Sequence, residues 1–321
     1  MKCILTIILL SFLISQDCDE GYSYIPVEDI PFSATSLPFN SGQAYTCFND
    51  GDLAFLNDLN GMNNLGYDSA LHLGTQTWNS GKLKIFVGTY TPNGAGINTT
   101  QINTIPETIS NLNELTTLYL EWNHITSLPS TFTSLPSLKN LYISNNQLQV
   151  LPDDFGNLQE LKILDLGYNY IPSIPESFVD LINLEYLWLF NNDITSIPDG
   201  ICNLNIAWSE MDNSYYPYFA IGGNELCYSD QTPECILNSD HFDESLDQFY
   251  YSFMYVVDQD CADINDDNAI DILDVLLIVE AIMDYDLPSQ NNESYNHMDV
   301  NDDSEIDIID LIALISIILS N

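Results

Sequence analysis

The sequence predicts an α/β protein: a solenoid whose repeats build one curved parallel sheet, with a cap at each end, followed by a small all-α module. Three observations support this prediction. A unit of 23 residues recurs without a gap from Leu115 onward. Asparagine and proline return at fixed places within that unit. Two acidic stretches near the end of the chain, 36 residues apart, each run directly into an apolar stretch.

The composition limits the possible partners. The chain has 321 residues, of which 45% are hydrophobic, so it can bury a sizeable core and form more than one domain. Five Lys and Arg residues stand against 47 Asp and Glu residues, which gives a formal charge of −42. Nucleic acid and anionic membrane surfaces are excluded as partners, because phosphate binding needs clustered cations. The charge favours divalent cation binding or solubility in a cation-rich medium.

Residues 1–16 are predicted to be a cleaved secretory signal. Lys2 precedes a nearly unbroken apolar run over 4–14, which is too short to span a bilayer well. No later segment is long and apolar enough for a membrane span. We therefore expect a secreted, extracellular protein with no transmembrane span after signal removal, and cell-surface association stays open.

Six cysteines remain once the signal is removed, and an even number in an exported chain favours disulfides. Fifteen pairings are possible. We favour Cys227–Cys235, because these two residues flank a short turn. The pairs left over would then be Cys18–Cys47 and Cys202–Cys261.

The repeat has the pattern LxxLxLxxNxIxxLPxxFxxLxx. Four complete units fill residues 115–206, residues 97–114 fit the last eighteen positions, and 215–227 fit the first half after an insertion around 207–215. Alternate leucines of each short strand point into a core that no single unit could bury alone. Asparagine at position 9 is expected to bond backbone groups at the turn, in a ladder of Asn123, Asn146, Asn169, Asn192 and Asn224. Proline at position 15 is expected to fix the convex return segment, at Pro106, Pro129, Pro152, Pro175 and Pro198.

This pattern resembles the leucine-rich repeat family, in its LPxxF class, over about 97–227. The resemblance implies a solenoid with its C-terminal cap over 97–235 and an N-terminal region and cap over 17–96. Within that cap, the spacing of Leu53, Leu56 and Leu59 predicts a helix, and 78–88 reads as a strand entering the sheet.

Outward-facing strand positions would form the concave face, where members of this family usually bind partners. Aromatic side chains with interspersed carboxylates are typical of a binding surface for a protein, peptide or glycan, although aromatics also suit outward strand positions in general. The candidate partner-binding residues there are Tyr119, Glu121, Trp122, Tyr142, Asp165, Tyr168, Tyr186, Trp188, Phe190 and Tyr218.

The two acidic stretches carry oxygen ligands at the spacing of a calcium loop, positions 1, 3, 5, 7, 9 and 12, with position 7 offering its backbone carbonyl. They predict two Ca²⁺ sites. The first would use Asp263, Asn265, Asp267, Ala269, Asp271 and Asp274. The second would use Asp299, Asn301, Asp303, Glu305, Asp307 and Asp310.

Two such loop–helix units in tandem, each with Asp at position 12, resemble the type I dockerin domain over about 260–321, with 236–259 as a linker. Position 6, usually Gly, is Asn268 and Ser304. The resemblance implies docking to a cohesin-like or surface partner. Positions 10 and 11, which carry that recognition in the family, are Ile272, Leu273, Ile308 and Ile309. The competing interpretation is that calcium only stabilises the fold of this module and that the module docks to no partner.

Catalytic motifs such as GxSxG, HExxH or a phosphate-binding loop are absent from the sequence. We therefore expect a secreted binding or adaptor protein that is not an enzyme. Its solenoid would bind a protein or glycan, and its calcium module would dock it to a partner or surface. The alternative is a dockerin-bearing accessory or enzyme component in polysaccharide breakdown.

Overall fold

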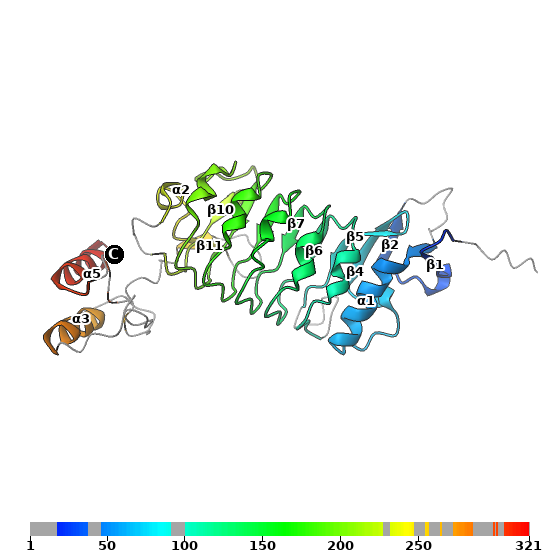
Figure 1. Ribbon diagram of the computed structural model, residues 1–321, viewed down its shortest axis with the longest axis horizontal. Helices are drawn as coiled ribbons and strands as arrows, with labels where there is room; N and C mark the ends of the chain where they lie inside the picture. Colours follow the sequence, from blue (N-terminus) through cyan, green and yellow to red (C-terminus); the bar gives the residue numbers. More distant parts are fainter. Residues whose placement is uncertain are drawn as a thin grey trace, which may run out of the picture.

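The solenoid is the largest ordered part of the chain. The computed structural model describes residues 18–37, 46–90, 100–226, 232–246, 254–256, 264, 272–284, 298, 300 and 305–320. Within these residues, eight strands form one sheet in the order β10-β9-β8-β7-β6-β5-β4-β2 (Figure 1). The predicted α/β solenoid is confirmed, and the predicted secretory signal lies outside the described residues.

The repeat strands pair in parallel, each displaced by one unit. Leu118 is opposite Leu141, Leu141 is opposite Leu164, and Leu164 is opposite Leu187, so position 4 of every unit falls in one row. These strands are short because each unit turns away after its second inward leucine. Their bounds are β6 Thr117–Tyr119, β7 Asn140–Tyr142, β8 Ile163–Asp165, β9 Tyr186–Trp188 and β10 Phe219–Ala220.

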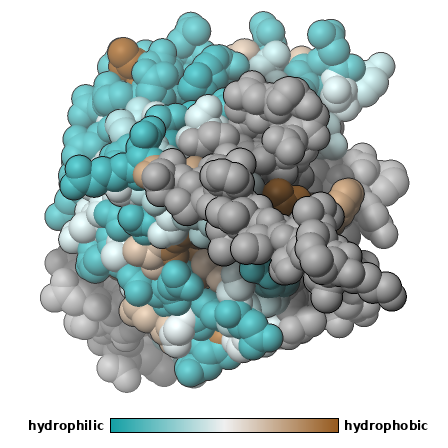
Figure 2. Space-filling view, turned by 90° about the vertical axis from the view of Figure 1, so that its right-hand side faces the viewer, coloured by the Kyte–Doolittle hydropathy of each residue, from teal (hydrophilic) through white to brown (hydrophobic). Residues whose placement is uncertain are grey.

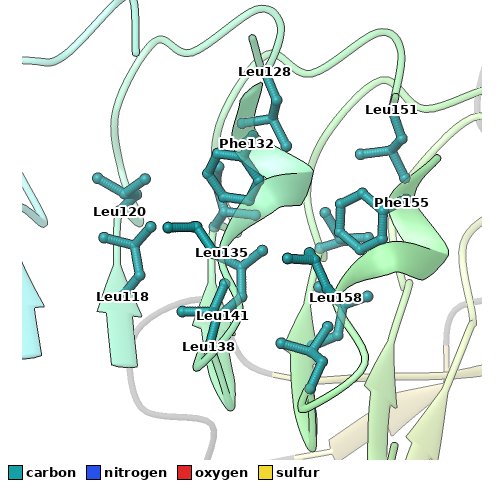
Figure 3. Close-up of a cluster of buried hydrophobic side chains, with 14 of the residues drawn as sticks. Leu118, Leu120, Leu128, Phe132, Leu135, Leu138, Leu141, Leu151, Phe155 and Leu158 are labelled. Carbon is teal, nitrogen blue, oxygen red and sulfur yellow. The ribbon is translucent and has the colours of Figure 1, made fainter. Parts of the chain in front are cut away.

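A continuous apolar core lies between the sheet and the convex side. Leu118 and Leu120 of the first unit meet Phe132 and Leu135 of its return segment, and the next unit repeats the arrangement (Figure 3). All four side chains are fully buried or nearly so. Each unit therefore completes the core of its neighbour, as expected for a solenoid.

The convex side is built from short 3-10 helices that follow the repeat prolines. Pro106, Pro129, Pro175 and Pro198 each precede such a helix directly, with φ between −57° and −72°. This confirms the predicted role of proline, whose ring fixes φ in this range. The helices are η3 Glu107–Asn111, η4 Ser130–Ser134, η5 Phe155–Asn157, η6 Glu176–Asp180 and η7 Asp199–Asn203.

The predicted asparagine ladder joins neighbouring units through backbone groups. Asn169 Oδ1 accepts from the Leu148 N–H at 3.0 Å, and its Nδ2 donates to the carbonyls of Ile143 and Leu166 at 3.2 and 3.0 Å. Asn146, Asn192 and Asn224 make equivalent bonds. The asparagines are buried, so they satisfy backbone groups that water cannot reach.

The N-terminal cap contains the predicted helix, α1 (Asp50–Met62). Asn49 caps it by accepting from the backbone of Gly51 and Asp52. The single strand expected over 78–88 is instead a hairpin of β4 (Thr75–Asn79) and β5 (Lys82–Val87). Ser80 and Gly81 form its two-residue turn with φ of 50° and 76°, which is the geometry that such tight hairpins need.

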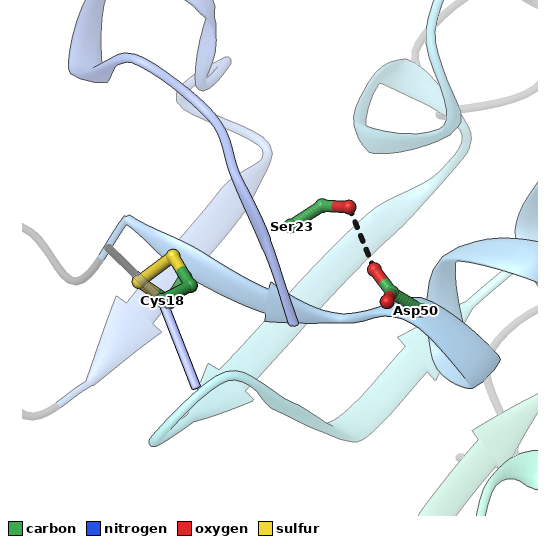
Figure 4. The surroundings of a disulfide bond; sticks show 4 residues. Cys18, Ser23 and Asp50 are labelled. Carbon is green, nitrogen blue, oxygen red and sulfur yellow. Dashed lines mark hydrogen bonds between the residues drawn. A yellow bond between two sulfur atoms is a disulfide. The ribbon is translucent and has the colours of Figure 1, made fainter. Parts of the chain in front are cut away.

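The outermost part of this cap is held by the disulfide Cys18–Cys47, which confirms that predicted pair. Next to it, the Ser23 hydroxyl donates to Asp50 at 2.6 Å (Figure 4). The described surface on this side of the molecule is mostly hydrophilic, as a solenoid cap requires (Figure 2). The elements here are β1 Tyr22–Tyr24, η1 Val27–Asp29, β2 Ala34–Leu37, β3 Cys47–Asn49 and η2 Ala70–His72.

Asp52 is a buried carboxyl in this cap, with 1% of its surface exposed. Its Oδ2 accepts from the Leu83 N–H at 2.8 Å, and its Oδ1 has no partner among the described residues. Burial raises the pKa of Asp52 from 3.8 to about 6, although the Leu83 bond and the nearby Lys82 charge oppose this. The folded chain therefore holds a proton between pH 4 and 6 that the unfolded chain releases.

This proton makes the folded state more stable as the pH falls from 7 to 4, because the folded chain binds more protons in that range. Asp52→Asn should remove the effect. The free energy of unfolding of the wild type, relative to that of the variant, should rise by about 2 kcal/mol between pH 7 and pH 4. Urea unfolding at both pH values measures it, with Asp50→Asn at the exposed start of the helix as control. A difference that does not change with pH would contradict the prediction.

At the other end, the cap disulfide joins Cys202 to Cys235, with the Cα atoms 5.6 Å apart. The predicted pairs Cys227–Cys235 and Cys202–Cys261 are therefore wrong. The short distance in sequence between Cys227 and Cys235 did not predict the pairing. The short helix α2 (Glu234–Leu237) instead packs on η7 and brings Cys235 to Cys202. Cys227 and Cys261 lie outside the described residues.

Residues 239–246, which we call the strap, follow α2 and cross the end of the sheet. The strap falls within the segment expected as a linker, and it includes β11 (Glu244–Leu246), which pairs with β12 (Met254–Val256). The Gly222 N–H donates to the Glu244 carbonyl at 2.9 Å. A Cβ on Gly222 would lie 2.5 Å from the backbone of Asp243, so only glycine allows this close approach.

In the described part of the C-terminal module, the helices α3 (Ile272–Asp284) and α5 (Ile308–Ser320) pack on each other. Each begins where the sequence predicted a helix after an acidic loop. Residues that are 36 positions apart in the sequence occupy equivalent places in the module: Ile278 and Leu314 are both fully buried. The core of the module also contains Ile264, Val275 and Ile306. No helix in the described residues is long and apolar enough to span a membrane.

Candidate binding sites

The concave face is organised in rows, because units pair in strict register. Position 5 gives the row Tyr119, Tyr142, Asp165 and Trp188, in that order across β6 to β9. Tyr119 and Tyr142 stack with ring centroids 4.5 Å apart and planes 2° apart. The 23-residue period thus brings residues distant in sequence side by side, although Asp165 interrupts the aromatic side chains of this row.

A hollow of about 390 Å³ lies on this face, open to solvent. Most of its lining residues lie on or just after the repeat strands, and two lie in or directly after the insertion that interrupts the repeats. Its lining residues are Tyr119, Glu121, Tyr142, Ile163, Tyr186, Trp188, Asp212 and Tyr216. We call this space the concave hollow.

Asp212 fixes the wall that the insertion contributes. Its carboxylate accepts from the backbone of Ser214 and Tyr216 at 2.7 and 3.0 Å, and from the Tyr186 hydroxyl at 3.0 Å. Burial is the largest single influence on the pKa of Asp212 and raises it, but the three hydrogen bonds together outweigh it and lower the pKa. The loop is thereby tied to β9, and an ionised carboxylate stands at one end of the concave hollow.

Glu121 provides the second lining carboxyl. It accepts from the Thr89 hydroxyl at 2.5 Å and is half-buried. Burial raises the pKa of Glu121 to about 7, and the charge of Asp165 adds to the increase, while the Thr89 bond opposes it. Burial likewise raises the pKa of Tyr119, Tyr142 and Tyr186, so these hydroxyls stay neutral at physiological pH.

Five of the ten predicted concave residues line the hollow, and the other five lie outside it. Trp122, Tyr168, Phe190 and Tyr218 do not line the hollow. The expected exposed aromatic column is wrong at its C-terminal end: Phe190 is fully buried and Trp188 is 7% exposed. The reason is the strap, whose Leu246 packs with both rings. Asp165 is also fully buried, and it accepts from the Gly167 N–H at 3.1 Å.

Position 8 of every unit adopts the left-handed backbone conformation. Asn145, Asn191 and Gly223 suit it, with φ between 51° and 68°. Trp122 and Tyr168 occupy the same position with φ of 63° and 52°, and bulky residues are uncommon there. The Tyr168 hydroxyl donates to the Leu246 carbonyl at 3.2 Å, so this strained residue holds the strap.

Three lining residues were missed from the sequence: Ile163, Asp212 and Tyr216. Ile163 was passed over because only polar and aromatic residues were considered at position 3. Asp212 belongs to the insertion, which interrupts the period and was therefore treated as a gap, and Tyr216 directly follows the insertion. The interruption itself was the usable signal, since an insertion in a solenoid maps to a loop on one face.

The apolar pairs of the C-terminal helices are exposed rather than buried. Ile272 and Leu273 are 61% and 50% exposed, and Ile308 and Ile309 are 64% and 51% exposed. Leu276 and Ile312, one turn further along each helix, are also exposed. We call these six residues the duplicated aliphatic patch. Its two halves match position for position at a spacing of 36 residues.

Four of the twelve predicted calcium ligands are described: Asp274, Glu305, Asp307 and Asp310. Asp274 and Asp310 are fully buried, and each accepts a backbone N–H from its own loop, from Ile264 at 2.9 Å and from Asp307 at 2.7 Å. The chain has no Lys or Arg after residue 162. Buried carboxylates in a segment that contains no Lys or Arg fit a bound metal cation.

No group of three or more metal-binding side chains is assembled within the described residues. The other eight predicted ligands belong to loop segments outside them. The two position-12 carboxylates therefore carry the structural evidence for a cation here.

Comparison with known families agrees with both halves of the architecture. The leucine rich repeat model matches residues 114–159 and 136–194. The Dockerin type I domain model matches residues 261–319. The chain thus contains leucine-rich repeats followed by a type I dockerin domain, a calcium-binding class of module. Both are non-catalytic modules that mediate protein interactions. No curated protein matches the chain significantly.

Solved structures that resemble the chain include PEPR1–AtPEP1, with 25% identity over 50% of this chain and a TM-score of 0.39. A leucine-rich repeat protein of Leptospira interrogans has 22% identity over 53% and a TM-score of 0.35. A plant ice-binding protein has 21% identity over 60% and a TM-score of 0.45. The chain covers 20%, 41% and 61% of these proteins, respectively.

Proposed function

We propose that this protein is a secreted, non-enzymatic adaptor. Its dockerin domain binds two Ca²⁺ and docks to a cohesin domain through the duplicated aliphatic patch, while the concave face of the solenoid holds a second partner. The observation that carries the proposal is the exposure of matched aliphatic residues on α3 and α5. Exposed aliphatic side chains in a contiguous patch mark interaction surfaces.

The calcium sites support the patch. In each copy the patch begins two residues before the position-12 aspartate, at Ile272 beside Asp274 and at Ile308 beside Asp310. A cation bound by that aspartate would fix the first turn of the helix and with it the patch. Docking should therefore need calcium.

Because the patch is duplicated, either half can dock. We expect that Ile272→Ser with Leu273→Ser, or Ile308→Ser with Ile309→Ser, weakens binding only a few-fold. All four substitutions together should weaken it more than about 100-fold, since each half buries its own aliphatic anchors. Calorimetric titration of the full chain with a cohesin domain in calcium measures this.

Ile182→Ser is the matched control, because Ile182 is an aliphatic residue with similar exposure, 65%, on the solenoid and outside the C-terminal module. Helix content by circular dichroism verifies that each variant folds. Binding of the quadruple variant at wild-type strength would refute docking through this patch.

A further inference from the structure

The concave hollow combines aromatic walls with negative charge. Five rings line it: those of Tyr119, Tyr142, Tyr186, Trp188 and Tyr216. They belong to three strands of the sheet and to the loop that follows β9. Aromatic faces attract organic cations through the negative charge above the ring plane.

The charged groups of the hollow all have the same sign. Glu121 and Asp212 line it. Asp165 lies between Tyr142 and Trp188 in the position-5 row. None of the described lining residues is cationic, and the sequence has no Lys or Arg between Lys84 and Lys139 or after Lys162. Of these lysines, Lys84 and Lys162 form ion pairs with Glu114 and Glu185, outside the hollow.

We propose that the concave hollow binds an alkylammonium group, either the side chain of a lysine in a partner peptide or a free quaternary ammonium ion. The inference rests on the proposed binding role of the concave face and names the chemistry of the ligand. At about 390 Å³, the hollow has room for one side chain or small molecule rather than a folded surface.

The alternative occupants fit less well. An anion would meet carboxylates and no compensating cation. A neutral sugar could stack on Tyr119 and Tyr142 but would carry no positive charge to pair with Glu121 or Asp212. An alkylammonium ion satisfies both the rings and the carboxylates. Its apolar methylene or methyl groups contact the rings while its charge faces Glu121 or Asp212.

The experiment is a titration of the full chain at 150 mM salt with three probes: Nα-acetyl-lysine methylamide, its trimethylated form, and its Nε-acetylated neutral form. We expect the two cations to bind and the neutral probe to bind at least about ten-fold more weakly. Tighter binding of the trimethylated probe points to a quaternary ammonium ligand, and tighter binding of the unmodified lysine points to a peptide.

Two variants locate the binding. Glu121→Gln keeps an acceptor for Thr89 but removes the charge, and Tyr142→Leu removes one ring. Each should weaken binding of the cations about five- to thirty-fold, the range for a desolvated cation–π or carboxylate contact. Glu160→Gln removes the same charge from an exposed position on another face and should change nothing.

The pH dependence gives an independent readout. Glu121, facing Asp165, Tyr119 and Tyr142, has a pKa of about 7, and the tyrosines stay neutral. A cation favours the ionised carboxyl, so affinity should fall as the pH is lowered from 8 to 6 and stay flat in Glu121→Gln. Neither cationic probe titrates in this range.

Equal binding of the neutral and cationic probes, no binding of either cation, or equal weakening by Glu160→Gln would each overturn the inference. The last result would mean that the cations only accumulate around a chain of charge −42. Docking is measured at α3 and α5, so a chain that binds cohesin but no alkylammonium ion refutes this inference alone.

Discussion

Asn169→Ala should lower the free energy of unfolding of the solenoid by about 3 to 5 kcal/mol, one of the two largest effects expected in this chain. The side chain of Asn169 bonds the Leu148 N–H and the carbonyls of Ile143 and Leu166. Its loss leaves these buried groups without partners, at a cost of about 1 to 3 kcal/mol each, partly relieved by relaxation.

The effect should be local before it is global, because each unit contacts only its neighbours. Hydrogen exchange should rise first in the units around Asn169. Asn183→Ala is the matched control: Asn183 is exposed and donates one bond to the Gln159 carbonyl at 2.8 Å. This substitution should lower the free energy of unfolding by less than about 1 kcal/mol. Urea unfolding curves of the two variants compare these values, and equal losses would show that the ladder adds nothing beyond an ordinary surface bond.

Calcium removal should unfold the C-terminal module and leave the solenoid intact. A module as short as residues 260–321 rarely folds on apolar burial alone, so it needs a staple. Its fully buried Asp274 and Asp310 would remain desolvated without a cation. At a calcium concentration 100-fold above Kd, each ion would contribute about 2.7 kcal/mol.

Hydrogen exchange of the full chain with and without a chelator measures this. Peptides from α3 and α5 should lose their protection in the chelator, while those from β6 to β9 should not change. Asp310→Ala should reduce the calcium stoichiometry by one. Glu305→Ala is the control, because position 7 offers its backbone carbonyl and the Glu305 side chain is exposed. Unchanged protection of α3 and α5 in the chelator would contradict the prediction.

The repeated parts of the fold could be predicted from the sequence, because their structure is set by local patterns. Leu118, Asn123 and Pro129 each lie where a 23-residue period places them. The same holds for the helices that follow the acidic loops. In these regions every unit makes the same contacts, so the structure predicted for one unit applies to all of them.

The unique contacts at the solenoid ends could not be predicted in this way. The Cys202–Cys235 pair depends on how α2 packs on η7, and the burial of Phe190 depends on the strap. Both are tertiary contacts between segments about 30 or more residues apart. The β4–β5 hairpin was the exception, since the Ser80–Gly81 dipeptide was a local turn signal that could have revealed it.

For the candidate site, the period predicted the contributions of the strands but not the loop that completes the hollow. Glu121, Tyr142 and Tyr186 were found because outward strand positions can be counted. Asp212 and Tyr216 reach the hollow only because Asp212 binds the Tyr186 hydroxyl and its own loop backbone. The repeat pattern marks where the insertion lies, but it does not predict which contacts the inserted residues make.

The strap also affects what happens when two copies of the protein meet. The last strand of a parallel sheet normally presents unpaired N–H and C=O groups, which can recruit a strand from another molecule. Here the backbone of Ile221 and Gly222, just past β10, already bonds His241 and Glu244. Sheet extension from this edge, and with it end-to-end polymerisation of the solenoid, is blocked by the chain itself.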